Sequence, residues 1–184
     1  GENMFTPEQK KTLLSLARNS ISSHFKPQFV TMPEDPAFQP KRGVFVSLHI
    51  NGNLRGCIGY IKGYKSIAES VKEMAIAAAF QDPRFPPLTE KELERVTIEI
   101  SILGELIPLQ KNELPVIGRD GLYIQHPYGS GLLLPQVAVE YNWKPETFLQ
   151  EVCRKAGLYT NAYLDPASVV YRFTADVFSE ADTF

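Results

Sequence analysis

A lone thiol stands between two glycines in the segment Leu54-Arg55-Gly56-Cys57-Ile58-Gly59. Glycine weakens a strand, and it usually marks a bulge or a close approach by backbone or ligand. Gly56 and Gly59 would therefore let a ligand come close to the backbone on either side of the thiol. Arg55 adds a positive charge, which favours the thiolate form of a neighbouring cysteine. This segment is the first candidate for a functional site.

The chemistry of Cys57 has two interpretations. As a nucleophile it would use His49 as its base, and we expect an apparent pKa below the ~8.5 of a free thiol. As a packing residue it would be a small buried side chain, which is a common role of free cysteine. Arg55 could likewise bind the carboxylate or phosphate of a ligand, or it could pair with Glu99 on the face of a sheet.

A proline-rich loop at 81–88 supplies Asp82, Arg84 and Phe85. The helix expected before this loop must lay its apolar side on the sheet, so it returns the chain to one rim of that sheet. Short rigid loops at such rims often carry binding groups. We therefore assign the three side chains to the site of Cys57, with Arg84 within about 15 Å of it, a gap that one small ligand can bridge. The alternative is that Asp82 only caps a turn and Arg84 is solvated at the far rim.

Alternating apolar residues predict a strand over 43–50 and a return strand through the thiol. A two-residue Asn51-Gly52 loop is the usual hairpin turn, but it would bring apolar and polar side chains onto one face. A three-residue loop keeps the apolar side chains together, and the buried face should decide the register. The expected cross-strand pairs are Val46 with Ile58, Ser47 with Cys57, and His49 with Arg55.

The elements of the chain suggest an internal duplication. Hairpin, helix and strand patterns occur at 43–59, 66–80 and 95–103, and they recur at 121–134, 137–156 and 169–178. Gly43-Val44-Phe45-Val46 also resembles Gly121-Leu122-Tyr123-Ile124, which gives two halves at 43–103 and 121–178. The sequence predicts an α+β fold with two hairpin-helix-strand sub-domains. Six strands would make one mixed, mainly antiparallel sheet, continuous or barrel-like, with helices packed on it.

Composition describes an ordinary globular protein. The chain has 184 residues, of which 43% are hydrophobic and 22% are charged. Gly1-Glu2-Asn3 before Met4 is typical of a cloning remnant, so we take 4–184 as a single domain. The net charge of −2 argues against a strongly electrostatic nucleic-acid binder. No apolar run reaches the roughly 18 residues that span a membrane, so we expect no membrane partner.

Cysteine and histidine usage bears on compartment and cofactors. Two cysteines without a CxxC spacing favour a reducing cytoplasm over a disulfide framework. The three histidines are too scattered for a metal signature, so no metal site is predicted. The sequence identifies no cofactor.

Four further segments accompany the hexapeptide Leu54–Gly59. They are Asp82-Pro83-Arg84-Phe85-Pro86-Pro87, Ile98-Glu99-Ile100-Ser101, Leu133-Leu134-Pro135-Gln136-Val137 and Cys153-Arg154-Lys155-Ala156-Gly157-Leu158. Together with the hexapeptide they resemble the AMMECR family, which is named from a human chromosomal deletion region and occurs in archaea and bacteria. The resemblance runs from about Phe5 to Phe178. Family members often carry a histidine before the glycine matched by Gly121, whereas this chain has Asp120, so no role of that histidine carries over.

The resemblance implies an α+β fold of unequal sub-domains with the hexapeptide beside a cleft, but it implies no particular reaction. Relatives fused to or neighbouring Memo-like and radical-SAM proteins imply membership of a modifying system. Two functions of different class therefore stay open. One is a thiol-dependent group-transfer or hydrolytic enzyme that uses Cys57, with Arg55 anchoring an anionic group of a small-molecule substrate. The other is a non-catalytic adaptor that binds a peptide or nucleic-acid segment.

Overall fold

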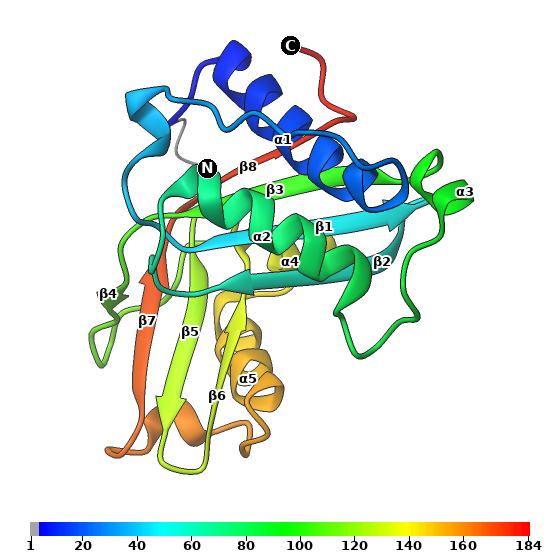
Figure 1. Cartoon of the computed structure of the whole chain (residues 1–184). Coiled ribbons are helices and arrows are strands. Elements are labelled where there is room, and N and C mark those ends of the chain that lie inside the picture. Colours follow the sequence, from blue (N-terminus) through cyan, green and yellow to red (C-terminus); the bar gives the residue numbers. More distant parts are fainter. Residues whose placement is uncertain (1–3) are drawn as a thin grey trace. The chain divides into compact units, whose positions relative to one another are not determined.

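The computed structural model describes residues 4–184, so the expected cloning remnant at 1–3 lies outside the described residues. The described chain forms two compact units (Figure 1). The larger unit contains residues 4–102 and 176–184, and the smaller unit contains residues 103–175. The larger unit is therefore discontinuous in sequence, because its last strand follows the smaller unit.

A four-stranded sheet in the order β2-β1-β3-β8 forms the base of the larger unit. Its strands are β1 (Val44–Ile50), β2 (Asn53–Tyr60), β3 (Thr97–Leu103) and β8 (Ala175–Ser179). Its helices are α1 (Pro7–Phe25), α2 (Ile67–Phe80) and α3 (Glu90–Leu93), with a 3-10 turn at Pro36–Phe38. Thr6 and Ser66 cap the starts of α1 and α2, because each hydroxyl accepts a hydrogen bond from the third N–H of its helix.

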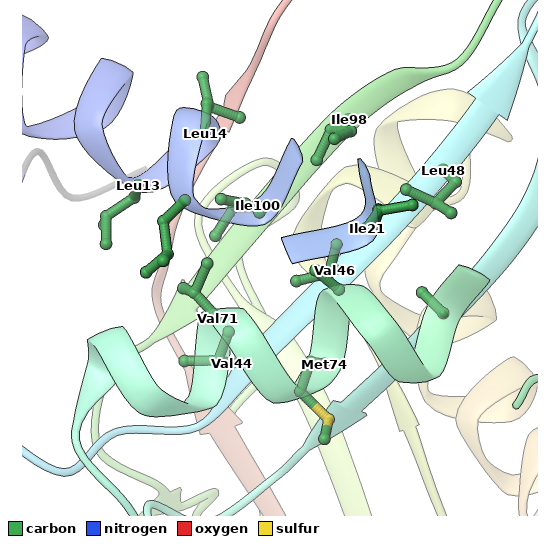
Figure 2. Close-up of a cluster of buried hydrophobic side chains, with 14 of the residues drawn as sticks. Leu13, Leu14, Ile21, Val44, Val46, Leu48, Val71, Met74, Ile98 and Ile100 are labelled. Carbon is green, nitrogen blue, oxygen red and sulfur yellow. The ribbon is translucent and has the colours of Figure 1, made fainter. Parts of the chain in front are cut away.

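The helices α1 and α2 supply the apolar layer that covers one face of this sheet (Figure 2). Val46 of β1 and Ile100 of β3 lie opposite each other and are fully buried. Leu13 and Ile21 of α1 and Val71 of α2 belong to the same cluster and are equally buried. Each such side chain contributes about 1.5–3 kcal/mol by leaving water. This layer fixes which face of β1 turns towards the helices.

The register of β1 and β2 around the thiol is the one predicted. Val46 lies opposite Ile58, and Ser47 lies opposite Cys57. Since Val46 belongs to the apolar layer, Ser47 and Cys57 share the opposite face of the sheet. The buried face has decided the register, as the alternation of apolar residues indicated.

The turn of this hairpin differs from the prediction. Asn51 and Gly52 form a two-residue loop, and both have positive φ (52° and 78°), as a type I′ turn requires. A bulge beyond Leu48 then places one extra residue, Arg55, on β2, so that His49 lies opposite Leu54. The expected three-residue loop and the His49–Arg55 pair are therefore wrong. Because the bulge shifts the register by one residue, the two-residue turn still leaves Val46 opposite Ile58 on the buried face.

A separate sheet in the order β4-β7-β5-β6 forms the smaller unit. Its strands are β4 (Ile107–Pro108), β5 (Gly121–His126), β6 (Gly129–Leu133) and β7 (Val169–Phe173). Its helices are α4 (Pro135–Glu140) and α5 (Pro145–Lys155), with a 3-10 turn at Ala162–Leu164. Leu122 and Ile124 of β5 pack with Phe148 and Val152 of α5 in its own buried core.

The α+β class is confirmed, but one continuous or barrel-like sheet of six strands is wrong. The described chain has two antiparallel sheets of four strands each. The strand expected over 169–178 is divided at Thr174 into β7 and β8, which belong to different sheets. The alternation of apolar residues runs on through this break, so the pattern gives no sign of it. The proposed duplication of 43–103 and 121–178 stays a prediction.

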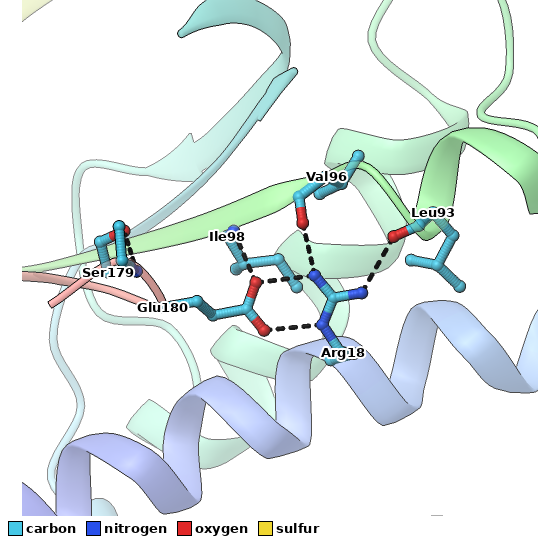
Figure 3. A network of polar contacts seen from close by, with 7 residues as sticks. Arg18, Leu93, Val96, Ile98, Ser179 and Glu180 are labelled. Carbon is cyan, nitrogen blue, oxygen red and sulfur yellow. Dashed lines mark hydrogen bonds and ion pairs between the residues drawn. The ribbon is translucent and has the colours of Figure 1, made fainter. Parts of the chain in front are cut away.

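Arg18 of α1 connects the end of β8 to the start of β3 (Figure 3). Its Nε and Nη2 lie 2.6 and 2.7 Å from the carboxylate oxygens of Glu180. Nη1 donates to the carbonyl of Leu93, and Nη2 donates to that of Val96. The Glu180 carboxylate also accepts the backbone N–H of Ile98 at 2.8 Å. A planar guanidinium can satisfy all these acceptors together, which a lysine ammonium at this place could not.

Candidate functional site

The loop that follows α2 contacts β2 directly at the thiol-bearing residue. Asp82 accepts the backbone N–H of Cys57 on its Oδ2 at 2.9 Å. The Nη2 of Arg84 donates to the backbone carbonyl of Cys57 at 3.3 Å. The prediction that the loop 81–88 lies beside Cys57 is therefore confirmed, since Arg84 was expected within about 15 Å of Cys57 and is hydrogen-bonded to it. The rival placement of Arg84 at a far rim is wrong.

Asp82 and Arg84 form a bidentate ion pair. The Nε of Arg84 lies 3.1 Å from Oδ1 of Asp82, and its Nη2 lies 2.8 Å from Oδ2. The backbone N–H of Arg84 also donates to Oδ1. The side chain of Asp82 is 2% exposed, whereas that of Arg84 is 50% exposed. The hydrogen bonds from Arg84, with the N–H of Cys57, outweigh burial and hold the pKa of Asp82 at about 2.

Arg55 is paired as well, with a carboxylate that the sequence did not suggest. Its Nε and Nη2 lie 2.8 and 3.1 Å from the two carboxylate oxygens of Glu92, in α3. Its Nη2 also donates to the carbonyl of Pro86 at 2.7 Å. The hydrogen bond from Arg55 lowers the pKa of Glu92. The carboxylate partner of Arg55 is therefore Glu92 and not Glu99, the acidic residue that one of the two alternatives named.

Phe85 lies within cation–π distance of both guanidinium groups. The Cζ of Arg55 is 5.7 Å from the ring centroid, and the Cζ of Arg84 is 5.5 Å from it. The ring is half-buried, while Pro83, Pro86 and Pro87 around it are exposed. The structure thus brings Arg55, Cys57, Asp82, Arg84 and Phe85 together in one cluster.

The two glycines of the hexapeptide have structural explanations. A Cβ on Gly56 would fall on the backbone carbonyl oxygen of Ala78, far inside van der Waals contact. A Cβ on Gly59 would fall on the ring of Phe45. Gly56 therefore lets α2 lie against β2, and Gly59 makes room for an aromatic ring. Neither glycine needs a ligand to account for it.

Burial raises the pKa of the Cys57 thiol, so the predicted lowering of that pKa is wrong. The hydroxyl of Ser47 donates to Sγ at 3.1 Å, and this bond and the charge of Arg84 oppose the rise. The charges of Asp82 and Glu99 add to it. Arg55 does not assist the thiolate, because its charge is committed to a carboxylate in α3. The thiol is the stable form at neutral pH.

His49 is the candidate base for the thiol, and Glu99 is an acidic residue on the same face of the sheet as Cys57. Within residues 4–184, His49 makes no hydrogen bond with Cys57, whose sulfur is bonded to Ser47. Glu99 lies opposite Ser47 on β3, so Ser47 stands between it and Cys57 on the face of the sheet. The hydrogen bond to the sulfur thus comes from a hydroxyl, whereas general-base catalysis by His49 would require hydrogen-bond reach to that sulfur.

Sequence reasoning missed the parts played by Glu92 and Ser47. Glu92 was recognisable as the third residue of a capping box, and it does accept the N–H of Thr89. Nothing in residue spacing marks it as the partner of Arg55. The register did place Ser47 beside Cys57, so its position could be found, but not the direction of its hydroxyl.

Acid should weaken the larger unit through Asp82. Its pKa is about 2 in the folded protein and 3.8 as an ordinary aspartate. Folding favours the carboxylate, so this contribution is complete above about pH 4 and is lost as the pH falls through about 2. The difference corresponds to about 2 kcal/mol in the free energy of unfolding. Urea unfolding at about pH 5 and about pH 2.5 measures the loss.

The matched variants Asp82→Asn and Asp182→Asn isolate this contribution. Asp82→Asn should be less stable at pH 5 and should show a smaller loss of stability on acidification. Asp182 also accepts a backbone N–H, from Ser179, but it is exposed, so its asparagine variant should lose less stability at pH 5 than Asp82→Asn. An undiminished pH dependence in Asp82→Asn would contradict the assignment.

Among residues 4–184, no group of three or more histidine, cysteine or acidic side chains is placed to hold a metal ion. No helix in the described part of the chain has both the length and the apolar character needed to cross a membrane. The cleft that the resemblance implies beside the hexapeptide stays a prediction.

Comparison with known proteins identifies the family. The AMMECR1 family model matches residues 14–178. A protein of Methanothermobacter thermautotrophicus is 41% identical over 182 residues, which cover 94% of this chain and 95% of the relative. Protein TK0174 of Thermococcus kodakarensis is 41% identical over 181 residues, covering 91% and 88%. The crystal structure of the uncharacterised protein PH0010 from Pyrococcus horikoshii has a TM-score of 0.89 and 36% identity, covering 97% of this chain and 95% of that one. The chain belongs to the AMMECR1 family.

Proposed function

We propose that this protein is a non-catalytic adaptor that binds a peptide segment of a partner protein through the loop 82–87. The observation that carries the proposal is that the charged side chains of the cluster pair with one another. Asp82, Arg84, Arg55 and Glu92 form two bidentate ion pairs, and these pairs hold the loop against β2 and α3. The hexapeptide thus supports the loop, and the sulfur of Cys57 receives its hydrogen bond from the Ser47 hydroxyl.

The loop has the properties of a preorganised binding element. Three prolines and the Asp82 hydrogen bonds restrict its backbone. It presents Pro83, Arg84, Pro86 and Pro87 to solvent around the half-buried Phe85. A loop that is already rigid loses little conformational entropy when a partner binds. Aromatic and arginine side chains are also the types that dominate protein–protein binding energy.

A peptide suits this surface better than a nucleic-acid segment. Affinity for nucleic acid comes mainly from lysine and arginine charges that neutralise phosphates. Here each arginine of the cluster is already offset by a carboxylate, and the whole chain has a net charge of −2. Contact with a peptide through proline, phenylalanine and the free edge of a guanidinium needs no excess positive charge.

Selection from a displayed library of random peptides tests the proposal, with overlapping peptides of Memo-like and radical-SAM proteins as a second source. Peptides captured by the protein should lose binding to Arg84→Ala and Phe85→Ala. They should keep binding to Cys57→Ser. Arg154→Ala is the matched control, because Arg154 is exposed on α5 in the smaller unit. Peptides that bind all four variants equally, or no enrichment at all, would overturn the proposal.

A thiol-dependent group-transfer or hydrolytic enzyme is the second candidate, favoured by the Ser47 hydroxyl bonded to the sulfur of Cys57. Cys57 is half-buried and Cys153 is fully buried, and both thiols are free, as suits a reducing cytoplasm. Iodoacetamide should therefore alkylate Cys57 before Cys153. Because burial raises both pKa values, each should react more slowly at neutral pH than a free cysteine peptide.

Mass spectrometry of the alkylated peptides over time measures both rates. Labelling of Cys57 faster than the free cysteine peptide would support the enzyme. Labelling in the expected order, with both rates slow, would leave Cys57 as a packing residue beneath the binding loop.

A further inference from the structure

The second face of the smaller sheet carries a row of polar side chains. Leu122 and Ile124 of β5 point towards α5, so Tyr123 and Gln125 point to the opposite face. Gln125 lies between Ser130 on β6 and Val169 on β7. Cross-strand neighbours of this kind stand about 5 Å apart, so their side chains can contact one ligand.

These residues line a hollow of about 420 Å³ that belongs entirely to the smaller unit. The volume lies in the range of small-molecule sites. Its lining residues are Tyr123, Gln125, His126, Pro127, Ser130, Ala167 and Val169. The hollow therefore combines two hydroxyl groups, a carboxamide and an aliphatic wall.

His126, at the rim of this hollow, is held in place by hydrogen bonds at both ring nitrogens. Nε2 of His126 lies 3.0 Å from Oδ2 of Asp165, and its Nδ1 accepts the N–H of Tyr128 at 3.1 Å. Since Nδ1 is an acceptor, Nε2 carries the proton and donates it to the carboxylate. The other oxygen of Asp165 accepts the N–H of Ala167. These hydrogen bonds connect the β5–β6 turn to the loop before β7. Both ring nitrogens of His126 are used in them, so neither is left to bind a ligand.

Three polar groups in the hollow keep unused hydrogen-bonding capacity. The carboxamide nitrogen of Gln125 donates to the Tyr123 hydroxyl at 3.0 Å. This leaves the phenolic proton of Tyr123 as a donor and the carbonyl of Gln125 as an acceptor. The Ser130 hydroxyl makes no hydrogen bond within the described chain, so it can act as either. None of the three is charged.

We infer that this hollow is a binding site for a neutral sugar or similar polyhydroxylated ring. Adjacent hydroxyl groups of such a ring can donate to the Gln125 carbonyl and accept from Tyr123 or Ser130. The C–H surface of the ring can rest on the aliphatic wall of Pro127 and Val169. An anion gains nothing here, because the Asp165 carboxylate already accepts the hydrogen bond from Nε2 of His126. A nucleobase finds little aromatic surface in the lining, because Tyr123 is only 7% exposed.

Titration of the whole protein with glucose, galactose and mannose, followed by amide NMR, tests this site, with uridine as the planar comparison. We expect at least one sugar to shift the amide signals of Gln125, Ser130 and Val169, with a dissociation constant of about 1 mM. Gln125→Leu should weaken this binding about tenfold, as loss of one hydrogen bond does. Gln150→Leu is the matched control, because Gln150 is exposed on α5.

Ser130→Ala provides a second variant in case Gln125→Leu disturbs the sheet, and it too should weaken binding. Three results would overturn the inference. They are no sugar-induced shift at the lining residues, shifts that persist unchanged in both variants, and a stronger response to uridine at the same residues.

Discussion

Val46→Asp should abolish folding of the larger unit. Val46 belongs to the apolar layer between α1, α2 and β3, and it is 0% exposed to solvent. An aspartate there would be a charge without a partner, which costs several kcal/mol even after its pKa shifts. That cost is comparable with the whole stability of a typical domain, about 5–15 kcal/mol. Circular dichroism and amide NMR would report the loss of structure.

Val139→Asp is the matched control, because the Val139 side chain is 56% exposed on α4. It should leave the protein folded with a stability change within about 0.5 kcal/mol. A folded Val46→Asp protein with normal stability would show that β1 turns its other face to the helices. The registry of Ser47 with Cys57 would then be wrong as well.

Gly56→Ala should cost about 3 kcal/mol or more. The new methyl group would meet the carbonyl oxygen of Ala78, which is a backbone atom in the last turn of α2 and cannot rotate away. Overpacking of a closed contact commonly costs about 1–3 kcal/mol, and a rigid obstacle puts this site at the upper end. The helix and β2 would have to separate, which should also loosen the loop that carries Asp82. Urea unfolding gives the stability, and the amide signal of Cys57 reports its bond to Asp82.

Gly52→Ala separates this packing effect from the general cost of replacing glycine. Gly52 has φ of 78° but no neighbouring atom that a Cβ would meet. Its alanine variant should therefore lose only about 1 kcal/mol, the cost of a left-handed backbone for an L residue. Equal losses in both variants would mean that Gly56 is not a packing contact.

The sequence predicts positions along the backbone better than it predicts partners of side chains. The alternation through Val46 places Ser47 against Cys57, and the length of α2 returns Asp82 to the thiol; both are confirmed. The pairing of Arg55 was out of reach, because Arg55 lies in a bulge that only the folded hairpin reveals and its partner Glu92 comes from a separate helix. The pKa of Cys57 depends on burial by the fold, which residue spacing does not contain.

The division into two sheets was equally beyond the sequence. β7 and β8 are joined at Thr174, and their apolar residues alternate as if they were one strand. Strand pairing depends on which edges lie free in the assembled units, and this is a long-range property. The helix starts at Thr6 and Ser66 are local, and these were predictable because a cap involves only the next three residues.

The position of β8 in the chain sets an order of events during synthesis. Glu180 bonds the N–H of Ile98 across 82 positions of sequence, and it meets Arg18 across 162. Until the ribosome has made the whole smaller unit, β3 has an open edge and the Arg18 guanidinium lacks its carboxylate. Such an edge can pair with other chains. The contiguous smaller unit can fold before β8 emerges, which shortens the loose chain that must close and lowers the entropy cost of adding the final strand.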